Sequence, residues 1–346
     1  MIRIGIIGLG RLGKLHYLNL LRIPHVKLVA VCDLYDQNLV FASHGGVRCY
    51  KDYKRMLDEA YLDGLVLSTP HSFRYEPISL CAAKGIDVFV DKPLATSTSE
   101  ANSILTVVRE NQTQLMVGAN FRYFPSVRRL KSMVQAGNFG RIIASAGELV
   151  LDGLFVNPVY DPAADLDWRM DPLRSGGGAL MNLGYHLIDL YLSLFGPLEF
   201  VSGRIESIFN LPVEDYAMIV LRSKDGVEIS MNVGLFAKSV TPKFTFRISI
   251  LGTALVESTD AFAPRNLTVH AAKQIITNLG RRAAFRPINY LAYTYYYSSY
   301  YEVMRDFVMT LVNGDNVPIP AETQLPTIAL IEKIYGALID AKNGSS

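Results

Sequence analysis

The chain has 346 residues, half of them hydrophobic, and a formal net charge of +2. This length allows two domains with a core each, and the mixed, nearly neutral charge gives no reason to expect a nucleic-acid partner. Cys32, Cys49 and Cys81 show no CxxC spacing, so we expect no bound metal and buried thiols in a reducing compartment. With no signal peptide and no apolar run of roughly 18 residues that would form a transmembrane segment, a cytoplasmic protein is expected.

The first recognisable motif is a glycine turn between an apolar run and a helical pattern. Residues 2–7 read as a buried strand, and Gly8, Gly10 and Gly13 follow it. In a dinucleotide-binding turn, such glycines permit the tight bend, the close approach of a pyrophosphate and the packing of helix on strand. The helix expected over residues 11–21 would direct its positive end at the phosphates. We therefore predict cofactor contacts from Gly8, Leu9, Gly10, Arg11, Leu12 and Gly13.

A carboxylate ends the second predicted strand, which spans residues 27–33. Asp33 stands where an acidic side chain can accept hydrogen bonds from the adenosine ribose hydroxyls, and it would repel a phosphate at the same place. Leu34 and Tyr35, which follow it, supply no basic group to pair with a phosphate. The sequence therefore favours NAD over NADP.

The first third of the chain alternates short apolar runs with helical patterns. The runs at residues 64–68, 87–90 and 114–117 predict further strands of a doubly wound parallel sheet. Ser97 and Glu100 have the spacing of a capping box, which marks the start of a helix. We predict an α/β dinucleotide-binding domain over residues 1–120.

The rest of the chain has a different sequence pattern, with longer predicted strands in which apolar and polar residues alternate. Asp225-Gly226 separates two such runs and predicts a hairpin, and residues 244–251 alternate apolar and polar side chains. Helical patterns follow at about residues 297–312 and 327–341. We predict an α+β domain over residues 121–346, built on a large, mainly antiparallel sheet with one open face.

Asp91, Lys92 and Pro93 follow the strand at residues 87–90. The carboxyl edge of an open parallel sheet is where ligands bind. An ammonium group there would hold a substrate hydroxyl and stabilise negative charge developing on its oxygen. A lysine that merely marks the end of a strand is the alternative.

A glycine turn at residues 176–178 leads into a second candidate element. Asn182, His186, Asp189 and Ser193 fall on one face of the helix expected there, while leucines occupy another face. A histidine in this position suits proton transfer near neutral pH. The pattern alone fits a structural histidine equally well.

Together these motifs resemble the Gfo/Idh/MocA oxidoreductases, the group of glucose-fructose oxidoreductase and inositol dehydrogenase. The segments that carry the resemblance are the glycine turn and residues 68–70, 91–93, 117–125, 167–169 and 176–186. The resemblance implies a Rossmann domain followed by a larger sheet whose open face often supports oligomers. A homodimer or homotetramer is therefore expected.

The resemblance also implies roles for individual residues. His186 would accept a hydroxyl proton, Lys92 would hold the same oxygen, and Asn182 would orient the imidazole. Further cofactor contacts are expected from Ser68, Thr69, Pro70, His71, Asp91, Lys92 and Asn120. Substrate contacts are expected from Lys92, Arg122, Tyr123, Trp168, Arg169, Asn182 and His186. The implied reaction is NAD-dependent oxidation or reduction of a secondary alcohol in a sugar, polyol or nucleotide sugar.

Two departures from the family pattern affect these expectations. Asn182 stands where the family usually has aspartate, and an amide cannot supply the charge that stabilises imidazolium, so Asp189 is a candidate substitute. The resemblance also links asparagine at this place to relatives that oxidise nucleotide-linked sugars. His71 and Arg74 stand where the family commonly has asparagine and histidine. Arg74 is either a contact for an anionic group or an ordinary surface residue.

The segment of residues 281–301 is unusually rich in tyrosine and arginine. It fits a platform for a nucleotide, a subunit interface, a membrane-surface contact or simple aromatic packing. Two other functions remain compatible with the resemblance. One is an NAD-assisted glycosidase or lyase, and the other is a catalytically silent regulator that senses the dinucleotide.

Overall fold

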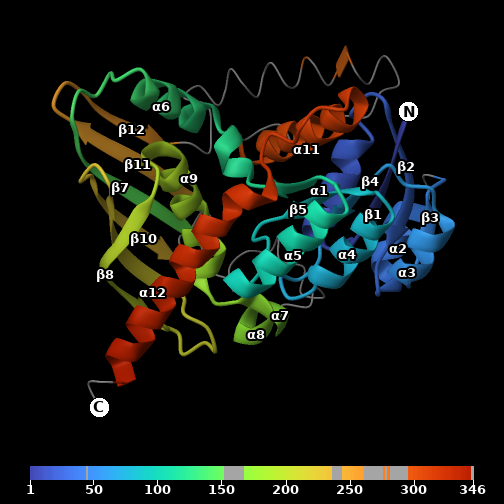
Figure 1. Ribbon diagram of the computed structural model, residues 1–346, viewed down its shortest axis with the longest axis horizontal. Coiled ribbons are helices and arrows are strands. Elements are labelled where there is room, and N and C mark those ends of the chain that lie inside the picture. The colour runs from blue at the N-terminus through green and yellow to red at the C-terminus, as the bar shows by residue number, and fades with distance from the viewer. Residues whose placement is uncertain are drawn as a thin grey trace.

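Two six-stranded sheets form the framework of the molecule, and they lie side by side in Figure 1. The computed structural model describes residues 1–43, 46–151, 167–235, 244–260, 276, 279–280 and 295–343. Within this part of the chain, no helix combines the length and the apolar character that crossing a membrane requires.

The first sheet contains parallel strands in the order β3-β2-β1-β4-β5-β6. Its strands are β1 (Ile2–Ile7), β2 (Val26–Cys32), β3 (Arg48–Tyr50), β4 (Gly64–Leu67), β5 (Asp87–Asp91) and β6 (Leu115–Gly118). The order reverses between β1 and β4, where the carboxyl ends of neighbouring strands leave a crevice for a ligand. The predicted doubly wound sheet is confirmed.

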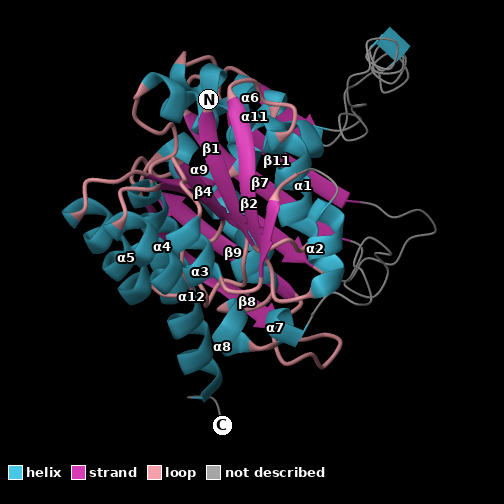
Figure 2. Ribbon diagram, turned by 90° about the vertical axis from the view of Figure 1, so that its right-hand side faces the viewer, coloured by secondary structure: helices cyan, strands magenta, loops and turns pink. Residues whose placement is uncertain are grey.

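Helices cover both faces of this sheet. They are α1 (Arg11–Leu20), α2 (Asp36–Ala42), α3 (Tyr53–Glu59), α4 (Tyr75–Ala83) and α5 (Thr98–Glu110). Figure 2 shows α3, α4 and α5 on one flank of the strands and α1 and α2 on the other. Strand β4 contributes to two hydrophobic cores, one on each face of the sheet. Leu65 and Leu67 pack into one core and Val66 into the other, because neighbouring side chains of a strand point to opposite faces. Ser97 caps α5 as predicted, although Glu100 reaches back to the amide of Thr96.

The second sheet has the strand order β12-β11-β7-β10-β9-β8. Its strands are β7 (Ile142–Leu151), β8 (Leu198–Glu206), β9 (Tyr216–Ser223), β10 (Glu228–Gly234), β11 (Phe244–Gly252) and β12 (Val256–Asp260). Only β7 and β10 pair in parallel among these strands; the other pairs are antiparallel. The predicted hairpin is present between β9 and β10, where Gly226 has φ +80. Ile229 and Met231 are buried while Glu228 and Ser230 are exposed, so one face is open as predicted.

Two long C-terminal helices connect the sheets. Helix α11 (Tyr295–Asn313) packs against α1 and β6 of the first sheet. Helix α12 (Leu325–Asn343) contacts α5 of the first sheet as well as α9 (Tyr185–Phe195) and β8 of the second (Figure 1). Both helices were predicted, but their return to the first sheet was not. The division of the chain at residue 120 stays a prediction.

Candidate active site

The glycine turn between β1 and α1 has the shape that a dinucleotide requires. Gly8 has φ +90, and a Cβ added there would lie 2.4 Å from the carbonyl oxygen of Ser68. A Cβ on Gly13 would lie 1.9 Å from the carbonyl oxygen of Gly8, so both positions exclude side chains. A Cβ on Gly10 would meet no heavy atom within 4 Å, and no side chain caps α1. The turn therefore fits a pyrophosphate beside Gly10, at the uncapped amides of the helix.

Asp33 lies beside this turn in a fixed orientation. Its Oδ2 accepts a hydrogen bond from the amide of Leu9 at 2.6 Å. Its Oδ1 accepts from the amide of Tyr35 at 2.9 Å and from the side chain of Asn38 at 3.1 Å. A carboxylate has about four acceptor sites, so it can still accept from ribose hydroxyls. The carboxylate is placed as NAD binding requires.

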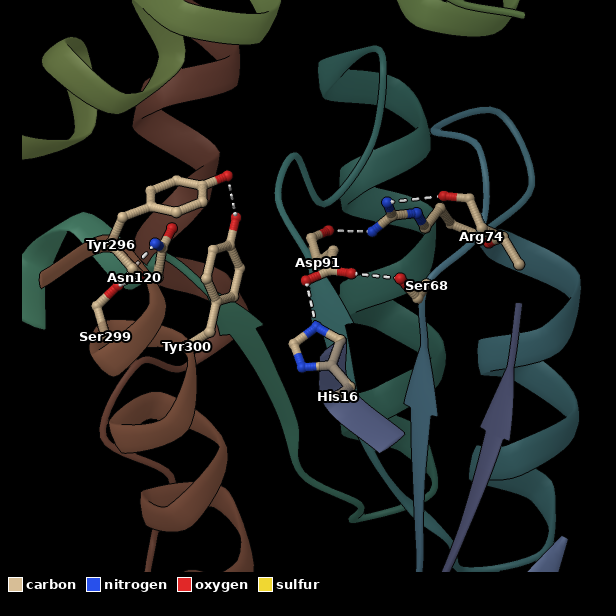
Figure 3. A network of polar contacts seen from close by, with 9 residues as sticks. His16, Ser68, Arg74, Asp91, Asn120, Tyr296, Ser299 and Tyr300 are labelled. Carbon is tan, nitrogen blue, oxygen red and sulfur yellow. Dashed lines mark hydrogen bonds and ion pairs between the residues drawn. The ribbon is translucent and has the colours of Figure 1, made fainter. Parts of the chain in front are cut away.

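Asp91 is the centre of a buried polar network at the end of β5 (Figure 3). Its carboxylate accepts from Ser68 Oγ at 2.6 Å and lies 2.9 Å from His16 Nε2. The guanidinium of Arg74 donates to the backbone carbonyls of Asp91 and Thr69. Burial alone would raise the pKa of Asp91, but His16, Ser68 and Arg74 outweigh burial and lower it. The segment just before Lys92 is thereby held in place.

The structure gives Arg74 and His71 different surroundings from those expected. Arg74 is only 1% exposed, so it holds backbone carbonyls and cannot meet an anionic ligand; burial lowers its pKa to about 10. His71 Nδ1 lies 2.9 Å from the carbonyl oxygen of Ser175, and its ring packs edge-on against Trp168. Arg74 therefore has a structural role, whereas the cofactor contact expected of His71 stays a prediction.

Lys92 and Asn182 are in direct contact. Lys92 Nζ donates to the backbone oxygen of Asn182 at 2.6 Å and to its Oδ1 at 3.1 Å. Asn182 lies in a π-helical turn, Leu180–Gly184, which leads into α9. Burial, supported by the positive charge of Arg169, lowers the pKa of Lys92 to about 7. Among the described contacts, the amide of Asn182 binds the lysine and not the imidazole that it was expected to orient.

His186 lies on α9, one turn after Asn182, and is 7% exposed. Its ring stacks on Phe121 with a centroid distance of 3.9 Å. Burial lowers the pKa of His186 well below its usual value, and the charge of Lys92 lowers it further. Asp189 does not support the imidazole, because it accepts from Arg122 Nε at 2.8 Å and Nη2 at 2.5 Å. The expectation that Asp189 substitutes for the missing carboxylate is wrong.

The remaining predicted side chains are not all brought together. Tyr123 is 5% exposed and packs in the core beside α11, with the Arg128 guanidinium 4.5 Å from its ring centroid, and its contact with a substrate stays a prediction. Asn120 donates to Ser299 Oγ on α11 at 2.9 Å. Trp168 is half-buried on the short helix α7 (Asp167–Met170), under the guanidinium of Arg169 at 4.3 Å. Of these residues, Trp168 and Arg169 are the ones placed near Lys92. Trp168 packs against the ring of His71, and the charge of Arg169 lowers the pKa of both His71 and Lys92.

Several residues of this region were missed by the sequence reasoning. His16 supports Asp91, and Phe121 stacks on His186. Glu214 accepts from the amides of Gly178 and Leu180, both at 3.0 Å, and from the hydroxyl of Tyr335 at 2.5 Å. It therefore caps the helical segment that carries Asn182 and His186. The one feature of the sequence that could have indicated this network was His16, a lone histidine among the apolar residues on the buried face of α1.

The described part of the tyrosine-rich segment packs on α1. Tyr300 is buried with its ring 5.9 Å from that of His16, and its hydroxyl lies 3.4 Å from that of Tyr296 (Figure 3). The Arg22 guanidinium lies 4.7 Å from the ring centroid of Tyr301. Aromatic packing therefore accounts for this part. Residues 281–294 lie outside the described residues.

Two smaller expectations concern cysteines and metals. Cys32 and Cys81 are buried, but Cys49 is exposed, because it lies on the short edge strand β3. In the described part of the chain, no group of three or more His, Cys, Asp or Glu side chains is placed to hold a metal ion.

Comparison with protein families agrees with this geometry. Residues 2–119 match the Gfo/Idh/MocA family model described as an oxidoreductase family with an NAD-binding Rossmann fold. Residues 127–254 match the C-terminal domain model of the same family. The chain belongs to the Gfo/Idh/MocA oxidoreductase family. Its cofactor is NAD, in agreement with Asp33 and the glycine turn.

Individual relatives of this family member are distant. The uncharacterized oxidoreductase YrbE of Bacillus subtilis is 26% identical over 78% of this chain and 76% of its own length. The myo-inositol 2-dehydrogenase of Thermotoga maritima is 27% identical over 65% of this chain and 66% of its own. The WlbA dehydrogenase of Bordetella pertussis, crystallised with NADH and UDP-GlcNAcA, shares the fold with a TM-score of 0.78 at 23% identity, over 98% of this chain and 97% of that one.

Proposed function

We propose that this Gfo/Idh/MocA protein is an NAD-dependent dehydrogenase that oxidises or reduces a secondary alcohol of a sugar, polyol or nucleotide sugar. The observation that carries the proposal is that a half-buried amine, Lys92, lies near enough to a buried imidazole, His186, for its charge to lower the pKa of the imidazole, at the carboxyl edge of the first sheet. Asn182 lies one turn before His186 and binds Lys92 Nζ, so both groups serve one small region.

The arrangement suits alcohol oxidation. When bound, NAD supplies a two-electron acceptor, and the residues must then hold the hydroxyl group and take its proton. Lys92 and His186 both face the reacting oxygen in this proposal, and each has a nitrogen able to donate or accept a hydrogen bond. The hydrogen bonds around Asp91 hold the backbone just before Lys92 in place. A preorganised, buried pair of this kind stabilises charge on oxygen better than water does.

The substrate class rests on relatives and on the wall of the site. One relative is named for a polyol, and one structural neighbour was crystallised with a nucleotide sugar. Trp168 and Arg169 offer an aromatic ring and a guanidinium beside Lys92. Such groups suit the apolar face of a sugar ring and its hydroxyl or acidic substituents.

The test is a substrate panel with purified protein and NAD. The panel contains myo-inositol, scyllo-inositol, glucose, glucose 6-phosphate and UDP-GlcNAcA, and both nicotinamide absorbance and product are followed. We expect at least one member to reduce NAD with formation of its ketone. Product without net nicotinamide reduction indicates the NAD-assisted glycosidase or lyase instead. Binding of NAD with no conversion of any member contradicts the proposal and favours the silent regulator.

We also propose that the open face of the second sheet forms a homodimer or homotetramer. Met218 and Val220 on β9 lie on this face and are only partly covered; Met218 pairs with Arg204 and Asn232, and Val220 pairs with Ser202 and Ser230. An apolar patch with a polar rim is typical of a protein interface. Light scattering should give a dimer or tetramer, and Val220→Arg should dissociate it. A wild-type monomer at micromolar concentration contradicts this proposal.

A further inference from the structure

We propose that Lys92, rather than His186, accepts the hydroxyl proton in this chain, and that Asn182 is the residue that positions its amine. The inference rests on the proposed function, since it assigns the proton of that reaction. It differs from the expectation taken from the family resemblance, in which the imidazole is the base and residue 182 serves it.

The hydrogen bonds of Lys92 leave one position on its nitrogen for a substrate hydroxyl. Lys92 Nζ donates to the backbone oxygen of Asn182 at 2.6 Å and to its Oδ1 at 3.1 Å. The remaining position, which is directed away from Asn182, is an N–H in the ammonium and the lone pair in the neutral amine. A substrate hydroxyl can approach that side.

The charges around Lys92 favour the same state. Arg169 on α7 and Arg74 before α4 are positive, and the nearby imidazole of His186 is neutral. Asp91 is the negative group that acts on Lys92, but its carboxylate already accepts from other partners at 2.6 and 2.9 Å. Burial is the largest influence, and it lowers the pKa of Lys92 to about 7. A base with this pKa accepts protons effectively near neutral pH.

His186 lacks what a histidine base needs. No carboxylate of the described residues contacts its ring, because residue 182 is an amide and Asp189 is bound to Arg122. One face of the ring is stacked on Phe121 at 3.9 Å. Protonation would place a positive charge in a buried site, and burial disfavours the charged form of the imidazole. His186 therefore stays neutral and serves as a hydrogen-bond partner of the same oxygen.

Oxidation of the alcohol gives one proton to Lys92 and one hydrogen with its electron pair to NAD. The O–H bond of the substrate breaks, and its proton binds to the lone pair of Lys92 Nζ, which becomes an ammonium. The carbon–hydrogen bond gives its hydrogen and electron pair to NAD, and the carbon–oxygen double bond forms from the electrons left on oxygen. The ammonium then releases its proton to solvent before the next turnover. In the reverse direction the Lys92 ammonium is the proton donor.

The primary test measures the titration of Lys92 without any substrate. The full chain is labelled with ¹³C at lysine Cε, and the Lys92 resonance is identified by its loss in Lys92→Met. We expect its midpoint near 7, against an ordinary lysine value of 10.5. Asn182→Asp should raise the midpoint by at least one pH unit, because it adds a negative charge at hydrogen-bond distance. Lys131, bound to Ser193 Oγ at 2.9 Å, is removed in the control variant Lys131→Met, which should keep the Lys92 resonance.

Kinetic measurements then show whether Lys92 or His186 accepts the hydroxyl proton. With the panel member that reduces NAD fastest, myo-inositol being the first tried, kcat/KM should fall at acid pH with the midpoint of Lys92. Asn182→Asp should move that midpoint upward, while His186→Gln should lower the rate tenfold or more and leave the midpoint in place. A Lys92 midpoint near 10.5, or an acid limb that disappears in His186→Gln, overturns the inference. If Lys92 titrates near 7 and no panel member reacts, the proposed substrate class fails and the state of Lys92 stands.

Discussion

Two polar regions meet at Lys92, and they are stabilised in different ways. The network before Lys92 surrounds the Asp91 carboxylate with His16 and Ser68, so its charge is fully hydrogen-bonded. The helix after it brings Asn182 and His186 to the lysine without a carboxylate of the described residues. In the first region nearby positive charge and hydrogen bonds lower the pKa of Asp91, and in the second burial lowers the pKa values of Lys92 and His186. The comparison suggests that the first region gives rigidity and the second gives proton transfer.

The largest expected change in stability comes from breaking the first region. Asp91→Asn removes a buried carboxylate that accepts from Ser68 and contacts His16, and leaving such buried polar groups without their partner costs about 3 kcal/mol. Urea denaturation at neutral pH measures the loss. The control is Asp36→Asn, whose exposed carboxylate binds Lys51 on the surface, and it should have almost no effect.

The pH dependence of the same pair of proteins adds to this test. The pKa of Asp91 is lowered in the native state, so its contribution is present at neutral pH and is lost as pH falls through the native value. The difference between wild type and Asp91→Asn should therefore shrink on acidification. A difference that stays constant, or a variant as stable as wild type at neutral pH, means that the network does not hold the carboxylate as described.

The second region should respond to pH in the same sense as the first, but over a more alkaline range. Because the native pKa of Lys92 is about 7, the unfolded chain binds more protons between that pH and 10.5. Stability from Lys92 therefore rises with pH across this interval, by at most about 1.4 kcal/mol per pH unit. Lys92→Met removes that slope, which denaturation at several pH values will show. Equal slopes in the two proteins contradict a buried, neutral lysine.

A smaller effect is expected from one hydrogen bond of the first region. Ser68→Ala removes the 2.6 Å bond to Asp91 and should lower the free energy of unfolding by about 1.5 kcal/mol, as for a hydrogen bond to a charged group. In the Asp91→Asn background the same change should cost much less. If the two losses simply add, Ser68 and Asp91 are not coupled, and the network is weaker than the distances indicate.

The smallest effect on the fold is expected at the glycine turn. Gly10→Ala meets no atom within 4 Å and should leave stability nearly unchanged, yet NAD affinity should fall tenfold or more, because the pyrophosphate passes there. Gly13→Ala is the contrasting variant, since its Cβ would overlap the carbonyl oxygen of Gly8 and disturb the turn itself. Calorimetric titration with NAD separates the two. Unchanged NAD affinity in Gly10→Ala places the cofactor elsewhere.

The sequence predicted the structural features that depend on residues close together in the chain better than those that depend on distant contacts. Five strands of the first sheet, the Asp225-Gly226 hairpin and the glycine turn follow from short runs of neighbouring residues, and all are present, whereas the three-residue strand β3 was not predicted. The partner of Asn182 was not readable, because it is set by contact between the residue after β5 and the π-helical turn before α9, which are far apart in the chain. The same holds for Asp189, taken by Arg122, and for the burial of Arg74. Motifs identify functional residues, while long-range packing decides which of them meet.

The rate of nicotinamide reduction in Lys92→Met tests the central claim most directly. It is measured beside Lys131→Met, in which an equally long lysine on α6 (Pro125–Gln135) is removed outside the site. With the same substrate and saturating NAD, Lys92→Met should bind NAD normally and lose at least about a hundredfold in kcat. Lys131→Met should keep the wild-type rate. Wild-type turnover in Lys92→Met would contradict the account of this site.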